Sequence, residues 1–174
     1  DNRTISNLTI SGSISSSGKD NVARFGWVGS GGQVQNLRRV NASLSGRYNI
    51  GNFVGTNYGT VSQCHADGFT LTAWAQIGGI VGMNYPSGII HRCDTGATGF
   101  VWGNAGMTGG ITGYESGTII QCYAACPVSS NTTFAVYTGG LVGYFGGKIH
   151  QSYATGAVTG TSYVGGLGGY LHGG

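Results

Sequence analysis

The chain has 174 residues, enough for a single domain with its own hydrophobic core. Only 7% of the residues are charged and the eight basic ones are scattered, which excludes the basic footprint of a nucleic-acid-binding protein. No apolar run reaches the ~18 residues of a membrane-spanning helix. Glycine is abundant, and Val, Ile, Thr and aromatic residues are plentiful, so we expect strands rather than helices.

A glycine-rich phrase recurs along the chain, most clearly as GGLVGY at 139–144. Aligned on its second-to-last residue, it returns every 26–31 residues. The glycine column is Gly29, Gly55, Gly82, Gly113, Gly143 and Gly169. The large apolar residue two positions earlier is Trp27, Phe53, Ile80, Ile111, Leu141 and Leu167. A helix carrying a phosphate-binding residue does not follow the phrase, so we interpret these glycines as structural.

A second phrase lies between the glycines, from TISNLTIS at 4–11 to KIHQSYAT at 148–155. It has two apolar columns on either side of a polar one. The first apolar column is Ile5, Val34, Val61, Ile90, Ile119 and Ile149, and the second is Leu8, Leu37, Cys64, Cys93, Cys122 and Ser152. The polar column is Asn7, Asn36, Gln63, Arg92, Gln121 and Gln151. It predicts a corner at which stacked amide side chains hydrogen-bond along the rod axis.

Each repeat therefore holds about three short strand-like segments separated by glycine or polar corners. This period without a helical pattern predicts an all-β fold, a parallel β-solenoid (β-helix) of about six coils of 26–31 residues. We expect it to be right-handed and to form one domain over residues 1–174. The expected coils are 4–32, 33–59, 60–88, 89–117, 118–147 and 148–174.

The segment GGLVGYFGGKIHQSYATGAVTG at 139–160 resembles the GLUG repeat, found in surface and secreted proteins of bacteria and archaea. The opening DNRTISNLTI also resembles the segment that begins many such arrays. The resemblance extends over almost the whole chain, with degenerate first and second coils. It implies an extracellular β-helical array and no particular activity.

The glycine-rich phrase is apolar on both faces of a strand, because successive side chains point to opposite sides. If Leu141 and its equivalents fill the rod, the alternate residues form an outward stripe. That stripe is Val81, Met83, Thr112, Tyr114, Val142, Tyr144 and Tyr170. An exposed apolar and aromatic stripe predicts a contact surface for glycans, a surface protein or another rod, unless loops cover it or the parity is reversed.

Three cysteines, Cys64, Cys93 and Cys122, share one column and should stack as a structural ladder of small buried thiols. An in-line ladder does not form the tetrahedral cluster that a zinc ion needs, so we expect no metal site. A disulfide within the ladder would be strained, because in-register side chains point the same way. Cys126 lies outside the column, and a bridge to Cys122 across a turn remains an alternative.

The five acidic residues do not cluster in one column, which argues against a catalytic carboxylate pair. The closest approach to one is Asp67 and Asp94, in successive coils but different columns, with Arg92 and His65 nearby. His91 and His150 share a column two coils apart, too far to bind one metal ion. We therefore expect no catalytic residues, no cofactor and no enzymatic activity, with a polysaccharide lyase or hydrolase as the alternative.

No capping helix or charged cap is evident at either end of the array. This pattern predicts contact with flanking repeats of a longer chain, or head-to-tail self-association into a filament. We thus expect a non-enzymatic, extracellular or cell-surface structural or adhesive protein; the alternative is a carbohydrate-binding or carbohydrate-active segment of a larger secreted protein. Ice binding would need a regular threonine array, which the chain lacks. Asn2, Asn41 and Asn131 are candidate N-glycosylation sites.

Overall fold

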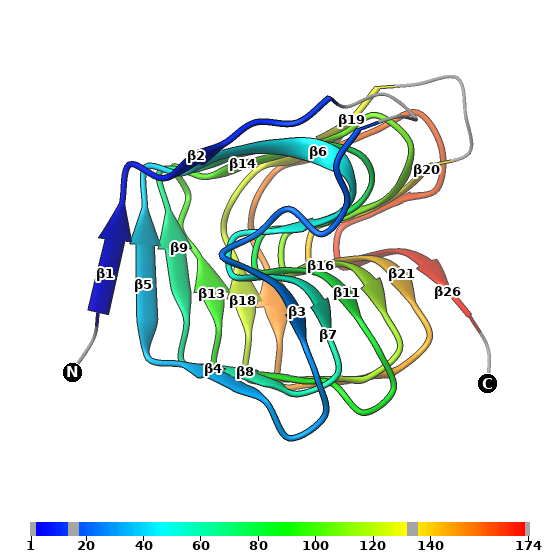
Figure 1. Ribbon diagram of the computed structural model, residues 1–174. Coiled ribbons are helices and arrows are strands. Elements are labelled where there is room, and N and C mark those ends of the chain that lie inside the picture. The colour runs from blue at the N-terminus through cyan, green and yellow to red at the C-terminus, as the bar shows by residue number, and fades with distance from the viewer. Residues whose placement is uncertain (1–2, 14–17, 132–135, 173–174) are drawn as a thin grey trace.

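The computed structural model describes residues 3–13, 18–131 and 136–172, and within these ranges it contains strands and turns but no helix. The strands wind into a parallel β-solenoid of about five turns, which confirms the predicted fold and is close to the predicted six coils (Figure 1). Among the described residues, each strand pairs in parallel with its equivalent in the next coil.

Four sheets run along the rod. Sheet A contains β1 (Arg3–Ser6), β5 (Leu37–Val40), β9 (His65–Asp67), β13 (Asp94–Thr95), β18 (Tyr123–Ala124) and β23 (Tyr153–Ala154). Sheet B contains β2 (Thr9–Ile10), β6 (Ser43–Gly51), β10 (Thr70–Gly78), β14 (Phe100–Gly103), β15 (Gly106–Gly109), β19 (Val128–Ser130), β20 (Val136–Gly139), β24 (Val158–Thr159) and β25 (Val164–Gly165). Sheet C contains β3 (Phe25–Val28), β7 (Val54–Asn57), β11 (Val81–Asn84), β16 (Thr112–Glu115), β21 (Val142–Phe145) and β26 (Gly168–Leu171). Sheet D contains β4 (Gln33–Gln35), β8 (Thr60–Ser62), β12 (Ile89–His91), β17 (Thr118–Ile120) and β22 (Lys148–His150).

Each coil after the first passes through sheets D, A, B and C in that order and so has four or five strands, rather than the three expected. Over the described residues of the first coil, only β1, β2 and β3 are present, in sheets A, B and C. Sheet B folds back on itself, which gives the coil two lobes in cross-section (Figure 1). We call sheet B the upper lobe, and sheets C and D the lower lobe. The returning half of sheet B lies beside sheet C, and this contact between the lobes creates the site described below.

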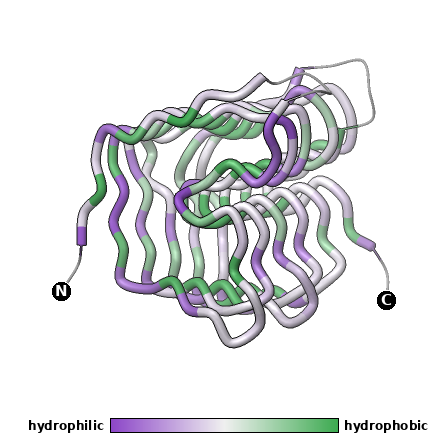
Figure 2. Tube along the Cα trace, viewed as in Figure 1, coloured by the Kyte–Doolittle hydropathy of each residue, from purple (hydrophilic) through white to green (hydrophobic). Residues whose placement is uncertain are grey.

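The core consists of apolar columns that run the length of the rod. Val34, Val61, Ile90 and Ile119 form one of them in sheet D. The hydropathy colouring shows apolar segments recurring at the same place in successive coils (Figure 2). Because each side chain packs on its own equivalent one coil away, the sequence repeat becomes a continuous buried stack.

The polar column forms the predicted corner between sheets D and A. The residues Asn36, Gln63, Arg92, Gln121 and Gln151 all have left-handed backbones, with φ between 48° and 57°. Stacked side chains also bond along the axis, as expected: Arg92 Nε donates to Gln121 Oε1 at 2.9 Å, and Gln121 Nε2 donates to Gln151 Oε1 at 3.0 Å.

The first coil does not follow the register expected from the sequence. Arg3–Ser6 pairs with Leu37–Val40, so Ile5 lies beside Arg39 and not in the column of Val34. Asn7 then falls at a different corner, equivalent to Asn41, and both have left-handed backbones. Asparagine tolerates this conformation at either corner. The sequence around Asn7 is therefore compatible with both corners, and the alignment assigned it to the wrong one.

The glycine column also shifts in the first coil. Phe25 pairs with Val54 and Trp27 with Thr56, which puts Gly26, and not Gly29, in register with Gly55. The N-terminal end of the rod also differs from the expected uncapped end, because part of the edge of sheet B is covered there. Residues 19–22 run beside β6, with the amide of Arg47 donating to the carbonyl of Lys19 at 2.7 Å.

Candidate functional site

The outward stripe predicted from the glycine-rich phrase is only partly present. Met83, Tyr114 and Tyr144 are half-buried and Tyr170 is 36% exposed. Val81, Thr112 and Val142 are fully buried, so their predicted exposure was wrong. The cause lies at the corner before sheet C, where the amides of Ile80 and Val81 both donate to the carbonyl of Ile111. Two successive amides sharing one carbonyl break the strand alternation, so both side chains point inward.

The remaining stripe residues form one wall of a groove between the lobes. We call this wall the lower column, and it belongs to sheet C: Thr56, Met83, Tyr114, Tyr144 and Tyr170. Facing it is the upper column on the returning half of sheet B: Asn49, Gln76, Met107, Tyr137 and Tyr163. The groove therefore runs along the rod, with one residue from each wall contributed by each coil.

The C-terminal part of the groove is filled by tyrosine rings. Tyr114, Tyr144 and Tyr170 stack with centroids 5.0 and 5.3 Å apart, and Tyr137 from the upper column lies 4.9 Å from Tyr170 and 6.0 Å from Tyr144. Such aromatic contacts each add ~0.5–1.5 kcal/mol beyond the area they bury. The tyrosines thus join the two lobes along this stretch.

Glycine is required at the base of the groove because backbones approach there closely. A Cβ built on Gly143 would lie 2.4 Å from the amide nitrogen of Thr108 in β15, and one on Gly113 would lie 2.5 Å from that of Ile77 in β10. No side chain fits at such distances. The glycine column predicted as structural therefore marks the line along which the two lobes meet.

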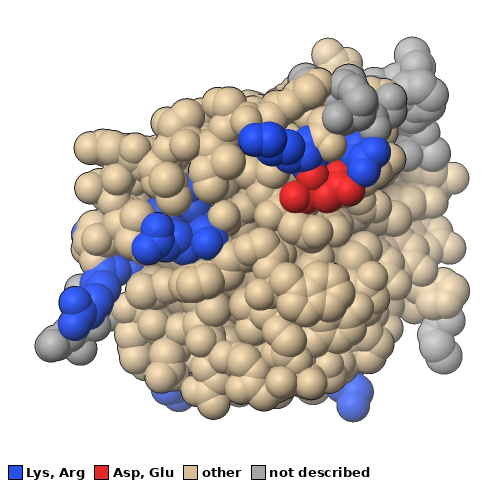
Figure 3. All heavy atoms as spheres, viewed as in Figure 1, with Lys and Arg blue, Asp and Glu red and all other residues tan. Residues whose placement is uncertain are grey.

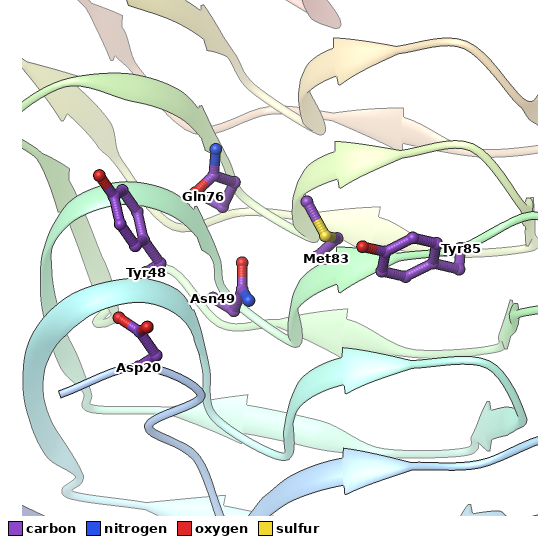
Figure 4. A pocket seen from close by; sticks show the side chains of 6 residues that line it. All are labelled: Asp20, Tyr48, Asn49, Gln76, Met83 and Tyr85. Atoms are coloured by element: carbon purple, nitrogen blue, oxygen red, sulfur yellow. The ribbon is translucent and has the colours of Figure 1, made fainter.

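The N-terminal part of the groove is open. A hollow of about 390 Å³ is lined there by the residues Asp20, Tyr48, Asn49, Gln76, Met83 and Tyr85 (Figure 4). Met83 and Gln76 occupy the positions that tyrosines take in later coils. Of the six, only Met83 was expected from the sequence. Aligning the residues of the upper column could have indicated Asn49 and Gln76.

Asp20 is the acidic residue of the hollow, and its charge is matched. Arg47 Nε and Nη2 donate to the two carboxylate oxygens at 2.7 and 2.6 Å. This hydrogen bonding to Arg47 holds the pKa of Asp20 below its usual range. On the face shown in Figure 3, acidic atoms gather in one place, in contact with basic ones. The lining of the hollow is therefore electrically balanced.

The cysteines lie as a buried stack. Cys64, Cys93 and Cys122 immediately precede paired residues of sheet A and are closed to solvent, and all four cysteines are free thiols. Burial raises the pKa of Cys93 well above its usual range. Cys126 lies apart from them, hydrogen-bonded by Thr95 Oγ1 at 3.2 Å, so no bridge to Cys122 is formed.

The outer face of sheet A brings together His65 and Asp94, whose Nδ1 and Oδ2 atoms are in contact. Asp67 instead accepts a 2.5 Å hydrogen bond from Thr98, so the two carboxylates have different partners. His91 and His150 are separated by Ile120, as expected. Within the described ranges, no three His, Cys, Asp or Glu side chains are grouped so that they could hold a metal ion.

Two of the candidate glycosylation sites can be located. Asn41 and Asn131 are exposed, whereas Asn2 lies outside the described residues. The described part of the chain contains no helix that is long and apolar enough to cross a membrane.

The last coil exposes the interior of the rod. Its strands β22 to β26 each have a paired neighbour on one side only within the described residues. A hollow of about 270 Å³ opens there, lined by Phe145, Ile149, Leu167, Gly168, Tyr170 and Leu171. Leu171 is 69% exposed and Leu167 44%. These leucines lie where earlier coils bury their equivalents, such as Leu141.

Comparison with known proteins identifies part of the repeat. Residues 134–159 match the GLUG motif. A curated protein named halomucin, from Haloquadratum walsbyi, is 42% identical to this chain over 79 residues. The aligned region covers 45% of this chain and 1% of that protein, so the chain spans a very small part of its relative. No solved structure matches the chain.

Proposed function

We propose that this chain, a repeat protein carrying a GLUG motif, is a non-enzymatic structural segment of a secreted or cell-surface protein. The relative at 42% identity is far longer than the chain, which supports a role within an extended array. The solenoid has the low charge and the repeated stacking surface that such an array needs.

The observation that carries this proposal is the apolar end of the last coil. Ile149, Leu167 and Leu171 border an open hollow, and the strands beside them have unpaired edges. Unpaired parallel edges over an apolar interior are completed best by another coil of the same repeat. That coil belongs either to the same array or to a second copy stacked head to tail. At the opposite end, Trp27 is 60% exposed and offers an apolar surface to such a neighbour.

Sedimentation and electron microscopy of the 174-residue chain test head-to-tail stacking. We expect oligomers that lengthen with concentration, and we expect Leu171→Glu or Trp27→Glu alone to stop the growth. Mixing the two variants should give dimers that grow no further, because each retains one intact end. Tyr123→Glu, on the outer face of sheet A, is the control and should still assemble. Monomers at all concentrations, or assembly unaffected by both end variants, would contradict head-to-tail stacking and leave a flanking coil of the same array as the neighbour of this end.

The alternative is a carbohydrate-active segment, and its strongest support is the contact between His65 and Asp94 on the outer face of sheet A. A screen for polysaccharide hydrolase and lyase activity tests it. Turnover that is lost on Asp94→Asn, with the fold preserved by circular dichroism, would favour this alternative over a structural role.

A further inference from the structure

The open N-terminal part of the groove is a site that the structural role does not use. Its volume, about 390 Å³, lies in the range of small-ligand pockets. In later coils, tyrosines occupy the same two columns and close the groove through contacts such as Tyr137–Tyr144. The hollow therefore exists because Gln76 and Met83 are smaller than the tyrosines that occupy the same two columns in later coils.

The polar part of the lining is held in place by hydrogen bonds. Asn49 Nδ2 donates to Asn21 Oδ1 at 3.1 Å, and Thr56 Oγ1 donates to the same oxygen at 2.6 Å. These bonds fix the amide of Asn49. The half-buried Asn49 is therefore presented to the hollow in one fixed orientation, beside the half-buried Gln76.

The aromatic walls of the hollow are held in place before any ligand arrives. Tyr85 stacks on Tyr58 with ring centroids 4.3 Å apart and planes 11° from parallel. The Arg47 guanidinium lies over the ring of Tyr48, 4.9 Å from its centroid. Restrained tyrosines offer rigid surfaces, apolar on the ring and polar at the hydroxyl, at a low entropic cost.

We propose that this hollow binds one or two residues of a neutral glycan. The matched charges of Asp20 and Arg47 leave no net charge for an ionic ligand. A pyranose ring offers hydroxyl groups for the polar side chains of the lining, such as Gln76, and an apolar C–H face for Tyr48 or Tyr85 (Figure 4). Glycan binding here is independent of end-to-end stacking, because the hollow lies on the side of the rod.

The decisive variant is Met83→Tyr. It places in the lower column the residue that Tyr114, Tyr144 and Tyr170 already provide, so it should fill the hollow while extending the stack. The chain should fold and assemble as before and lose glycan binding. Tyr48→Ala and Tyr85→Ala should each weaken binding roughly tenfold. Tyr153→Ala, whose ring lies on the outer face of sheet A, should leave it unchanged.

Binding is measured on a panel of immobilised neutral and acidic glycans and neutral peptides, with affinities from titration calorimetry for those retained. Retention of neutral glycans by the unchanged chain and their loss in Met83→Tyr would support the proposal. It would be overturned if no glycan is retained, if only acidic glycans or peptides are, or if Met83→Tyr binds as well as the unchanged chain. None of these outcomes alters the test of end-to-end assembly.

Discussion

The side-chain amide of Asn84 donates to both carboxylate oxygens of Glu115, at 2.9 and 3.1 Å, in a place closed to solvent. Asn57 continues the arrangement one coil earlier, with its Nδ2 donating to Asn84 Oδ1 at 2.8 Å. The three residues are in register on β7, β11 and β16. A buried ladder of amides thus ends on a carboxyl group.

Glu115 should make the stability of the chain depend on pH. Burial raises its pKa well above the usual value of 4.5, so the folded state holds the proton more tightly than the unfolded one. The stabilising contribution is therefore complete below pH 4.5 and is lost as pH rises through the raised pKa. We expect Glu115→Gln, which is always neutral, to remove this pH dependence, while its amide nitrogen loses one of the two hydrogen bonds that Asn84 donates to the carboxyl group.

Urea unfolding between pH 4 and pH 8 checks this expectation. The slope of stability against pH should flatten in Glu115→Gln and should persist in Asp67→Asn, whose carboxyl group lies in the more exposed contact with Thr98. Equal slopes in Glu115→Gln and the unchanged chain would show that Glu115 does not titrate as described.

Two glycines should respond differently to the same substitution. A Cβ at Gly143 would lie 2.4 Å from the backbone of β15, whereas nothing lies within 4 Å of one at Gly29. We expect Gly143→Ala to lower the free energy of unfolding by roughly 3 kcal/mol and Gly29→Ala to change it little. Thermal unfolding of both variants measures the difference. A similar loss in both would mean that glycine is needed for some reason other than close approach.

Arg39 is a buried cation in an apolar column. Its side chain is fully enclosed, Nη1 donates to the carbonyl of Asn52, and Nε and Nη2 find no acceptor among the described residues. Burial lowers its pKa to about 10. Arg39→Met removes this cost while filling the space, and should stabilise the chain by roughly 1–3 kcal/mol in denaturant titration.

The neighbouring Arg38 provides the matched control for Arg39, because its side chain is exposed on the outer face of the same strand. Arg38→Met should leave the free energy of unfolding within about 0.5 kcal/mol. Destabilisation by Arg39→Met would indicate that the guanidinium holds Asn52 in a way that outweighs the cost of its burial.

The thiols should be unreactive in the folded chain. All four cysteines are buried, and burial raises the pKa of Cys126 to about 11. Hydrogen bonding to Cys93 lowers the pKa of Cys64 and of Cys122, but both side chains are closed to solvent, so a reagent cannot reach them. We expect a thiol reagent such as dithionitrobenzoate at pH 8 to label none of them natively and all four in guanidinium chloride. Rapid labelling of any thiol without denaturant would show that the stack opens.

The columns in the middle of the chain could be predicted from the sequence because each contact there repeats. Val61, Ile90 and Ile119, for example, share one column in both the alignment and the structure. The predicted register of the first coil was wrong because Asn7 and Asn36 lie at different corners that accept the same residue type. Only strand pairing distinguishes two corners with the same backbone requirement.

The groove could not be predicted in the same way. The alternation of a straight strand puts Val142 outside, but the shared carbonyl at each corner turns it inward. The folding back of sheet B, which brings Tyr137 against Tyr144, leaves no periodic signal in the sequence. The sequence therefore predicted Tyr144 as a surface residue, but it gave no indication that Tyr137 lies across the groove from it.

The in-register pairing of coils has a consequence for the length of the molecule. Thr60, Ile89 and Thr118 occupy one position in three successive coils, so deleting residues 89–117 would bring Thr118 directly onto Thr60. A whole coil can be lost or duplicated without changing any contact beyond the new junction. Genes encoding such arrays are therefore free to vary in size by complete repeats, while a deletion of part of a coil would shift every column after it.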